Sequence, residues 1–492
     1  MQLKTAKIEV IAGSLSAKLL ESYASAIVLA PTKDLVLKTL PHGADIAKRM
    51  ERATYKVGAA SPFVTDLPNK LGTRISIAGI KPDISAFELL TLGRKLVAAH
   101  SELRPTRIAI ACHGLDVELA TRAYEAIVAA ALAAGAELPT YKKESDRPPL
   151  PTLAVFAGSL SLDFARTIAT ARGNALARYL TALPPNELTP GNYRNRVLRL
   201  AREYKWKTRF LDIKALQKLN AGAFLAVAQG SPEPDAGILH LQYTPKASKK
   251  PPLALVGKGI CFDTGGTNLK NAKYMHGMHE DMQGSAVALG TLLALTELKV
   301  DFPVDCWLAL AQNHIGPKSY RQNEVVKAAN GMSIEVMHTD AEGRMVLADT
   351  LYLASQRKPK LLIDYATLTG ACIGALSTRM SGALTNRPAL IPTLIKAGDE
   401  SGERVWPFPL PGDYAEALKS EIADIKQCIL ENDADQILAA LFLQRFLVND
   451  PDWVHIDLAA ANHKGGLAHI PTDVTGFGVR LTLNLLLDRI PL

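Results

Sequence analysis

The stretch Leu253–Gly266, LALVGKGICFDTGG, pairs an apolar run with a glycine-rich turn. The run Leu253–Cys261 has the length and composition of a buried strand. Asp263 stands just past the carboxyl end of that strand, which is where open α/β sheets place their ligands. Gly265 and Gly266 let the backbone approach a bound group closely. The stretch therefore predicts an α/β sheet with a site at the end of this strand.

Further strands and helices are predicted around this stretch. The strands lie at Val304–Ala311, Ile334–Met337, Leu361–Tyr365 and Val454–Leu458, and helical patterns precede them at Asp163–Leu180 and Asn192–Tyr204. Strands separated by helix-length segments indicate a mostly parallel sheet. We therefore expect a large C-terminal α/β domain over residues 159–492.

The N-terminal third shows the same alternation on a smaller scale. Strands are predicted at Ile8–Ile11, Ala26–Ala30, Arg74–Ile80, Arg107–Ala111 and Thr152–Gly158, and helices at Ser85–His100 and Asp116–Ala134. The charged, proline-rich segment Tyr141–Pro151 is typical of a linker. Because 492 residues exceed what one core usually organises, we expect a separate, smaller α/β domain over residues 1–158.

Composition excludes several classes of protein. The chain is 48% hydrophobic and 21% charged, as in ordinary globular proteins. Its N-terminus lacks the apolar core of a signal peptide, and the run Ala126–Ala136 is too short to cross a bilayer, so a cytoplasmic protein without a membrane segment is expected. The five cysteines form no Cys-x-x-Cys pair, which argues against a disulfide framework or a zinc knuckle.

The net charge of +8 leaves nucleic acid open as a partner. In residues 1–150, however, 20 basic residues against 15 acidic ones form no cluster, which gives DNA binding little support.

Two charged segments carry the candidate chemistry. The first contains Lys258, Asp263, Lys270 and Asp281. It is not a P-loop, because Lys258 is followed by glycine and the position of the leading glycine is a proline.

The second segment, Thr339–Arg344, reads TDAEGR and contains Asp340 and Glu342. Thr339 and Glu342 also fit a capping box at a helix start. If both segments converge, four carboxylates meet in one cleft, and two divalent cations would balance their charge, as in two-metal hydrolases.

At these residues the sequence resembles the leucine aminopeptidase (cytosol aminopeptidase) family of dinuclear metallopeptidases. The motifs VGKGICFDTGG, NLK, EDMQGSA and TDAEGR occur in the family's order, and the likeness extends through ARYLTALPPNELTP, AQGSPEP, YATLTGACIGAL, SEIAD and HIDLA. It thus covers nearly the whole chain after residue 160. The resemblance favours a ligand role for Asp340 and Glu342, although Thr339 could still cap the helix.

The resemblance implies a role for each matched residue. Lys258, Asp263, Asp281 and Glu342 would bind the tighter metal, and Asp263, Asp340 and Glu342, with the Asp340 carbonyl, the exchangeable one. Zn²⁺ or Mn²⁺ is expected, and Mg²⁺ or Co²⁺ is an alternative. Lys270 would polarise the scissile carbonyl, and Arg344 would hold a bicarbonate that acts as general base for a metal-bridging water. The residues expected around the substrate's first side chain are Met278, Thr367, Leu368, Gly370 and Ala459.

The resemblance also implies a function and an assembly. We expect a homohexameric metal-dependent aminopeptidase that removes leucine and other apolar N-terminal residues from peptides. The alternatives are a DNA-binding or regulatory protein on the same fold, and an inactive scaffold, which a missing ligand would have suggested.

The sequence departs from the family at a few positions. His338 replaces a usual asparagine. It could be a ligand of a third metal, but a hydrogen-bonding role beside the ligands is favoured, because the ligand set is complete without it. Ala460 replaces a glycine, and Asn462 stands where many members have an apolar residue. The segment ENDADQILAA lacks glycines that are common in the family. His276 and His279 are interpreted as loop residues.

Overall fold

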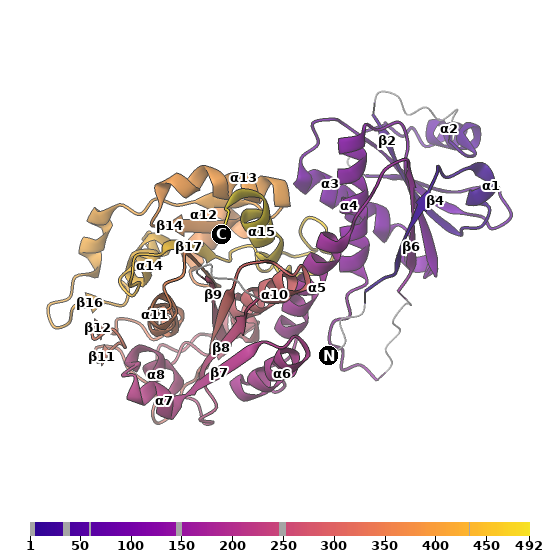
Figure 1. Ribbon diagram of the computed structural model, residues 1–492. Helices are drawn as coiled ribbons and strands as arrows, with labels where there is room; N and C mark the ends of the chain where they lie inside the picture. The colour runs from indigo at the N-terminus through magenta and orange to yellow at the C-terminus, as the bar shows by residue number, and fades with distance from the viewer. Residues whose placement is uncertain (1–4, 33–39, 59–60, 144–149, 246–251, 432) are drawn as a thin grey trace. The chain divides into compact units, whose positions relative to one another are not determined.

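The computed structural model describes residues 5–32, 40–58, 61–143, 150–245, 252–431 and 433–492 (Figure 1). The chain divides into two compact units. The smaller comprises Met1–Arg172, Asp399–Gly402 and Lys464–Asp473, and the larger comprises Gly173–Gly398, Glu403–His463 and Val474–Leu492. The smaller unit therefore takes two short segments from far along the chain.

The smaller unit is built on a six-stranded sheet. Its order is β1 (Ile8–Ala12), β6 (Thr152–Gly158), β5 (Arg107–Cys112), β2 (Ser25–Pro31), β4 (Arg74–Ile80) and β3 (Phe63–Asp66), with β3 alone antiparallel to its neighbour. Alternate residues of β2 enter different cores: Ile27 and Leu29 lie in the core that includes α3 (Ala86–Ala98) and α4 (Val117–Ala134). Ala26 and Val28 lie in the core that includes α1 (Ala17–Leu20) and α2 (Gly43–Arg52). The period of two places these cores on opposite faces of the sheet.

The larger unit is built on an eight-stranded sheet. Its order is β15 (Val405–Pro407), β14 (Ser381–Thr385), β17 (Asp452–Asp457), β13 (Leu361–Ala366), β9 (Leu253–Asp263), β10 (Val304–Asn313), β8 (Gly237–Tyr243) and β7 (Lys207–Asp212). The four central strands from β17 to β10 are mutually parallel. Its main helices are α6 (Pro190–Glu203), α7 (Ile213–Lys218), α8 (Gly222–Ala228), α10 (Gln283–Glu297), α11 (Glu342–Ser355), α12 (Gly370–Leu376), α14 (Asp435–Gln444) and α15 (Val479–Asn484). The larger unit also includes α5 (Ala165–Thr181) from Gly173 on and α13 (Ile391–Ser401) up to Gly398. The predicted α/β class with mostly parallel sheets is confirmed.

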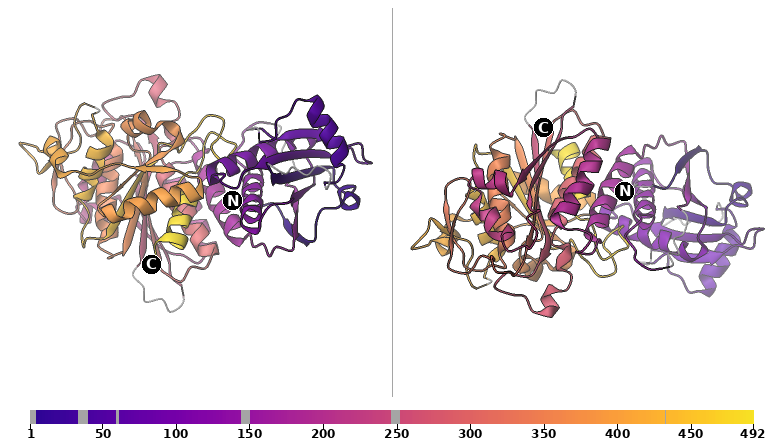
Figure 2. Two further views of the ribbon diagram at one scale, coloured as in Figure 1. Left: turned by 90° about the horizontal axis from the view of Figure 1, so that it is seen from above. Right: turned by 90° about the horizontal axis from the view of Figure 1, so that it is seen from below.

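Helices α10 and α11 pack against opposite faces of β9 (Figure 1). Ala254, Val256 and Ile260 share a core with α11, so the intervening Lys258 points to the same side. A side chain at Gly257 would lie 2.4 Å from the Cα of Ser285 in α10, which explains a glycine next to the lysine. The close approach of α10 thus requires the small residue, while Lys258 faces α11. Figure 2 shows helices on both sides of this sheet.

One predicted strand has a different place. Ile334–Met337 is not in the main sheet: β12 (Ser333–Glu335) pairs with β11 (Val325–Lys327) and β16 (Ile425–Lys426) in a separate three-stranded sheet. Only Ile334 of β12 is fully buried, so a strand this short does not have the apolar run that a central strand needs. The predicted linker Tyr141–Pro151 lies largely outside the described residues.

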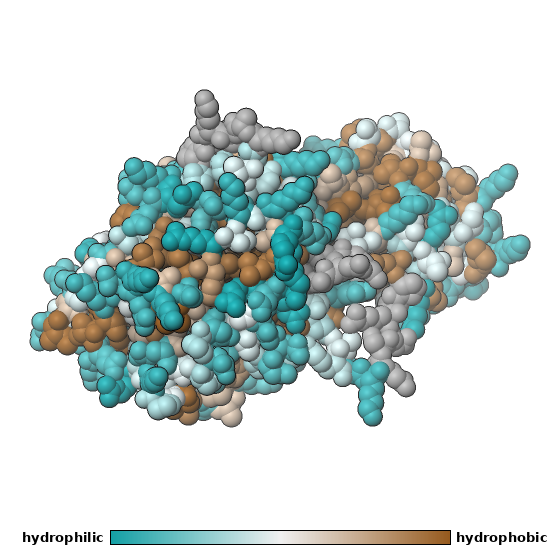
Figure 3. Space-filling view, turned by 60° about the horizontal axis from the view of Figure 1, so that its bottom comes forward, coloured by the Kyte–Doolittle hydropathy of each residue, from teal (hydrophilic) through white to brown (hydrophobic). Residues whose placement is uncertain are grey.

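Among the described residues, no helix combines the length and the apolar character that crossing a bilayer requires. The face drawn in Figure 3 is mainly hydrophilic, with hydrophobic residues in groups between the polar ones.

Candidate active site

The candidate site lies in the larger unit, at the carboxyl ends of its central parallel strands. Asp263 and Asn313 end the adjacent strands β9 and β10 and are partners in their register. On the other side, β13 and β17 end in register at Ala366 and Asp457, and loops containing Thr367 and Ala459 follow. Four consecutive parallel strands therefore deliver their following residues to one edge of the sheet.

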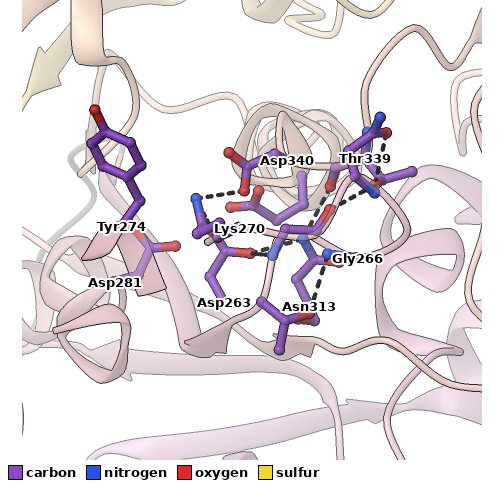
Figure 4. Close-up of polar contacts among 12 residues, drawn as sticks. Asp263, Gly266, Lys270, Tyr274, Asp281, Asn313, Thr339 and Asp340 are labelled. Atoms are coloured by element: carbon purple, nitrogen blue, oxygen red, sulfur yellow. Dashed lines mark hydrogen bonds and ion pairs between the residues drawn. The ribbon is translucent and has the colours of Figure 1, made fainter. Parts of the chain in front are cut away.

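The two charged segments of the sequence meet here (Figure 4). Carboxylate oxygens of Asp263, Asp340 and Glu342 lie within 4.8 Å of one another. Lys270 Nζ lies 3.0 Å from Asp263 Oδ2 and 2.5 Å from Asp340 Oδ1. Because Asp263 and Asp340 are far apart in the chain, this contact brings the end of β9 together with the start of α11.

Lys258 joins the fourth carboxylate to the group. Its Nζ lies 2.9 Å from Asp281 Oδ2 and 2.9 Å from Glu342 Oε1, and it donates a hydrogen bond of 2.9 Å to the carbonyl of Thr367. Thr367 in turn donates to Asp281 Oδ1 at 2.6 Å. The structure thus brings together six of the seven charged residues predicted from the two segments. The seventh, Arg344, lies two residues after Glu342 in α11.

Burial raises the pKa of three of the acids, Asp281, Asp340 and Glu342. It raises the pKa of Glu342 to about 7, and repulsion from Asp263 adds to that effect. Burial likewise raises the pKa of Asp281 to about 7, against the attraction of Lys258, and that of Asp340 to about 6. Four carboxylates face only two ammonium groups, so the cluster favours binding of further positive charge.

The pKa values of the two lysines also rise, but for a different reason. Burial disfavours their charged forms, but the surrounding carboxylates outweigh it and raise the pKa of both Lys258 and Lys270. Both amines are therefore protonated at neutral pH when no metal is bound.

Several neutral groups fix the carboxylates in place. Asn313 Nδ2 and the Gly265 amide donate to Asp263 Oδ1 at 2.8 and 2.9 Å. Asn313 Nδ2 and the Tyr320 hydroxyl also donate to the carbonyl of Thr339, at 3.0 and 2.8 Å. Sequence analysis missed Asn313 and Tyr320, although the position of Asn313 at the end of an apolar run is a signal that could have indicated it.

Thr339 does not cap helix α11. The helix begins at Glu342, and no side chain caps it. The Thr339 hydroxyl instead donates to the carbonyl of Gly265 at 2.6 Å and accepts from the Asn268 amide at 2.8 Å. The capping-box interpretation is therefore wrong, because the Glu342 side chain turns toward Lys258 and Thr339 ties the two charged segments together.

The residues predicted to surround the substrate lie on neighbouring loops. Asp457 accepts hydrogen bonds from the Leu368 amide at 3.2 Å and from the Thr369 hydroxyl at 2.6 Å, which holds the loop that leads to Gly370. Ala459 follows Asp457 and is buried. Met278 begins a short helical turn, Met278–Glu280. Asn462, in the segment after β17, donates a hydrogen bond of 2.6 Å from its Nδ2 to Glu280 Oε2 and so links that segment to the turn.

The acidic cluster fits divalent cations. Glu342 is 1% exposed, and its Oε2 atom has no hydrogen-bond partner among the described residues. An unpartnered buried carboxylate oxygen is costly unless a cation binds it. Carboxylate oxygens with an amine nitrogen are ligands that suit Zn²⁺, Mn²⁺ and related ions.

The surroundings of Arg344 do not fit the predicted bicarbonate, because Asp435 already binds its guanidinium. Arg344 Nη2 lies 2.7 and 2.9 Å from the two carboxylate oxygens of Asp435, and Nη1 donates to the Gln427 carbonyl at 3.2 Å. Sequence analysis did not single out Asp435. The chain's own acid thus takes the contacts that an outside anion would need.

The profile of the cytosol aminopeptidase family, catalytic domain, matches residues 175–483. This chain belongs to that family. A probable cytosol aminopeptidase of Synechococcus sp. (strain CC9605) is 38% identical over 400 residues, which cover 78% of this chain and 81% of the relative. One from Prochlorococcus marinus is 41% identical over 317 residues, or 63% of each chain. One from Stutzerimonas stutzeri is 43% identical over 323 residues, 65% of this chain and 64% of the relative. The chain thus spans less than two thirds of the length of the last two.

A solved structure agrees with this assignment. A mutant of tomato leucine aminopeptidase superposes with a TM-score of 0.86 at 26% sequence identity, covering 99% of this chain and 97% of that one. The resemblance seen in the motifs is therefore confirmed, and it extends in fold to the smaller unit.

The structure shows the hydrogen bonds of two residues that depart from the cytosol aminopeptidase family, His338 and Asn462. His338 Nδ1 accepts a hydrogen bond of 3.3 Å from the Asp340 amide, and burial lowers the pKa of His338. Asn462 binds Glu280 as described above. His276 is exposed and His279 half-buried on the loop before Asp281.

Proposed function

We propose that this chain is a metal-dependent leucyl aminopeptidase-type hydrolase that removes N-terminal residues from peptides. The observation that carries the proposal is the group of four carboxylates at the ends of parallel strands, three of them buried, compensated by only two lysines. Membership of the cytosol aminopeptidase family and the fold shared with a leucine aminopeptidase support it. No observation on the described residues favours DNA binding.

We assign the metal ligands as the resemblance implies. Lys258, Asp263, Asp281 and Glu342 would hold one divalent cation, and Asp263, Asp340 and Glu342, with the Asp340 carbonyl, a second. When bound, such ions polarise a carbonyl group and lower the pKa of water. Because Lys258 must lose its proton to act as a ligand, loading of the site should release protons.

Lys270 is the group we assign to the scissile carbonyl. Its side chain is 14% exposed, against 4% for Lys258, so it is the lysine that a substrate can reach. An ammonium aimed at the oxygen where negative charge develops lowers the barrier to attack. We assign the first side chain of the substrate to Met278, Thr367, Leu368, Gly370 and Ala459, whose apolar members favour leucine and similar residues.

The proposal also covers the catalytic domain, the cellular location and the oligomeric state. We place the catalytic function in residues 159–492 and propose a cytoplasmic homohexamer. The resemblance to the family is what supports the homohexamer.

Metal analysis beside kinetics tests the function. Chelator-treated protein should lose hydrolysis of an aminoacyl anilide and regain it with Zn²⁺, Mn²⁺ or Co²⁺. Asp340→Ala and Glu342→Ala should lower the metal content, because each removes compensating charge. Lys270→Ala should keep both ions but lose roughly a hundred- to a thousandfold in turnover, as for one oxyanion donor. Unchanged metal content and turnover in Asp340→Ala and Glu342→Ala would refute the assignment.

A further inference from the structure

Arg344 is a buried cation whose charge is met by one acid from a distant part of the chain. Its side chain is 2% exposed, and Asp435, 91 residues further on, is the carboxylate that it contacts. Asp435 is the first residue of α14, and the preceding Ala434 adopts φ 53°, in the left-handed region. The backbone thus turns sharply just before the residue that pairs with Arg344.

Asp435 contacts Nη2 of Arg344, the nitrogen that any bidentate anion on this guanidinium must use. A guanidinium offers two forked faces to a planar anion, one formed by Nε with Nη2 and one by Nη1 with Nη2. Both faces include Nη2, and Asp435 engages Nη2 through both of its oxygens, at 2.7 and 2.9 Å. Nη1 also donates to the Gln427 carbonyl. Nε has no hydrogen-bond partner among the described residues, but bidentate binding on that face also needs Nη2, which Asp435 occupies. A dissolved planar oxyanion could therefore reach Nε but finds neither face open for bidentate binding.

The position lies next to the charged cluster. Arg344 follows the proposed ligand Glu342 by two residues on the first turn of α11. The Asp435 side chain is 18% exposed, so solvent reaches the pair from the Asp435 side. If this carboxylate were removed, a small anion from solution could replace it on Arg344.

We propose that Asp435 is a built-in anion for Arg344. Its carboxylate takes the place of a dissolved planar oxyanion such as bicarbonate, so that the wild-type chain neither binds nor needs one there. Asp435 is a positioning residue, because it acts by holding and neutralising the guanidinium beside the cluster. The consequence for turnover rests on the proposed aminopeptidase function, whereas the consequence for anion binding does not.

The test compares anion binding and turnover in the full-length protein. ¹³C-labelled bicarbonate is titrated and followed by NMR, and peptide hydrolysis is measured in carbon-dioxide-free buffer with and without added bicarbonate. Wild type should show no binding that depends on Arg344, and its turnover should not respond to bicarbonate. Asp435→Gly should bind bicarbonate and lose roughly ten- to a hundredfold in turnover without it, the usual cost of losing a group that positions residues around a metal site. Added bicarbonate should restore that turnover.

Two further variants separate this role from a purely structural one. Asp435→Asn keeps the size but not the charge, so it should be impaired and not rescued, because the amide still fills the space. Asp433→Asn changes an exposed acid on the same loop and should behave as wild type. If the glycine variant does not fold, Asp435→Ala carries the same expectations.

Two results would overturn the proposal. One is bicarbonate binding to wild type that Arg344→Ala abolishes, since Arg344 would then be open to solution anions. The other is an Asp435→Gly protein that binds no bicarbonate and keeps full turnover. If wild type proves to have no aminopeptidase activity, the proposed function fails, but the binding measurements still decide the role of Asp435.

Discussion

Gly343 lies between Glu342 and Arg344 and allows the closest approach of α11 to Lys258. A Cβ atom added at this position would lie 2.7, 2.8 and 2.9 Å from the Nζ, Cε and Cδ atoms of Lys258. Favourable contacts between such atoms begin at about 3.5 Å. In Gly343→Ala, Lys258 must therefore leave its position, where it contacts Asp281 Oδ2, Glu342 Oε1 and the Thr367 carbonyl, each at 2.9 Å.

The size of the effect follows from what Lys258 gives up. Disrupting a buried ion pair costs about 3–5 kcal/mol. Alanine in place of glycine inside a helix returns about 1 kcal/mol. Since Lys258 is only 4% exposed and has little room to move, we expect the free energy of unfolding to fall by about 2–4 kcal/mol. We also expect weaker metal binding, because the displaced amine cannot act as a ligand.

Urea denaturation and metal analysis of the purified protein measure both effects. Gly374→Ala is the matched control, since Gly374 lies in helix α12 and has no neighbour within 4 Å of the added carbon. It should be as stable as wild type or slightly more stable. A Gly343→Ala protein with wild-type stability and full metal content would show that Lys258 is not held as described.

Two further measurements check other parts of the molecule. His100 is 1% exposed and lies 2.9 Å from the Ser76 hydroxyl, and burial lowers its pKa from 6.5 to about 4. Below pH 6.5 His100 takes up a proton in the unfolded chain but not in the folded one. The free energy of unfolding is therefore largest above pH 6.5 and falls by up to about 3 kcal/mol as the pH is lowered to 4. The stability of His100→Asn should fall less over this range in urea titrations, and equal slopes would contradict the assignment. Sedimentation should show six associated chains, and a stable, active monomer would refute the hexamer.

Local patterns predicted the elements well where one physical signal dominated. The run Leu253–Cys261 is apolar except for Lys258 and lies within β9, and Arg74–Ile80 and Thr152–Gly158 have the same bounds as their strands. The order of strands could not be predicted, because periodicity indicates which face a residue occupies and not which strand lies beside it. Ile334–Met337 was misplaced for that reason.

The site was predicted only as far as its residues form sequence motifs. Asp340 and Glu342 share one short segment, and the resemblance gave them a role. Asp435 has no such signal, because its partner lies 91 residues away and the contact exists only once α14 packs against α11. Thr339 was misjudged because the capping pattern is local, whereas its hydroxyl bonds to the distant loop at Gly265.

The smaller unit is not contiguous in the chain, and this matters for dissecting the protein. Besides its first 172 residues it contains Asp399–Gly402 and Lys464–Asp473. Arg94 Nη1 donates to the carbonyls of Gly465 and Ile470, at 2.7 and 3.0 Å. A protein cut after residue 172 would keep both late segments while losing the partners that order them. No single cut can therefore yield the catalytic half alone, and separating the halves would require replacing these two segments with short loops as well.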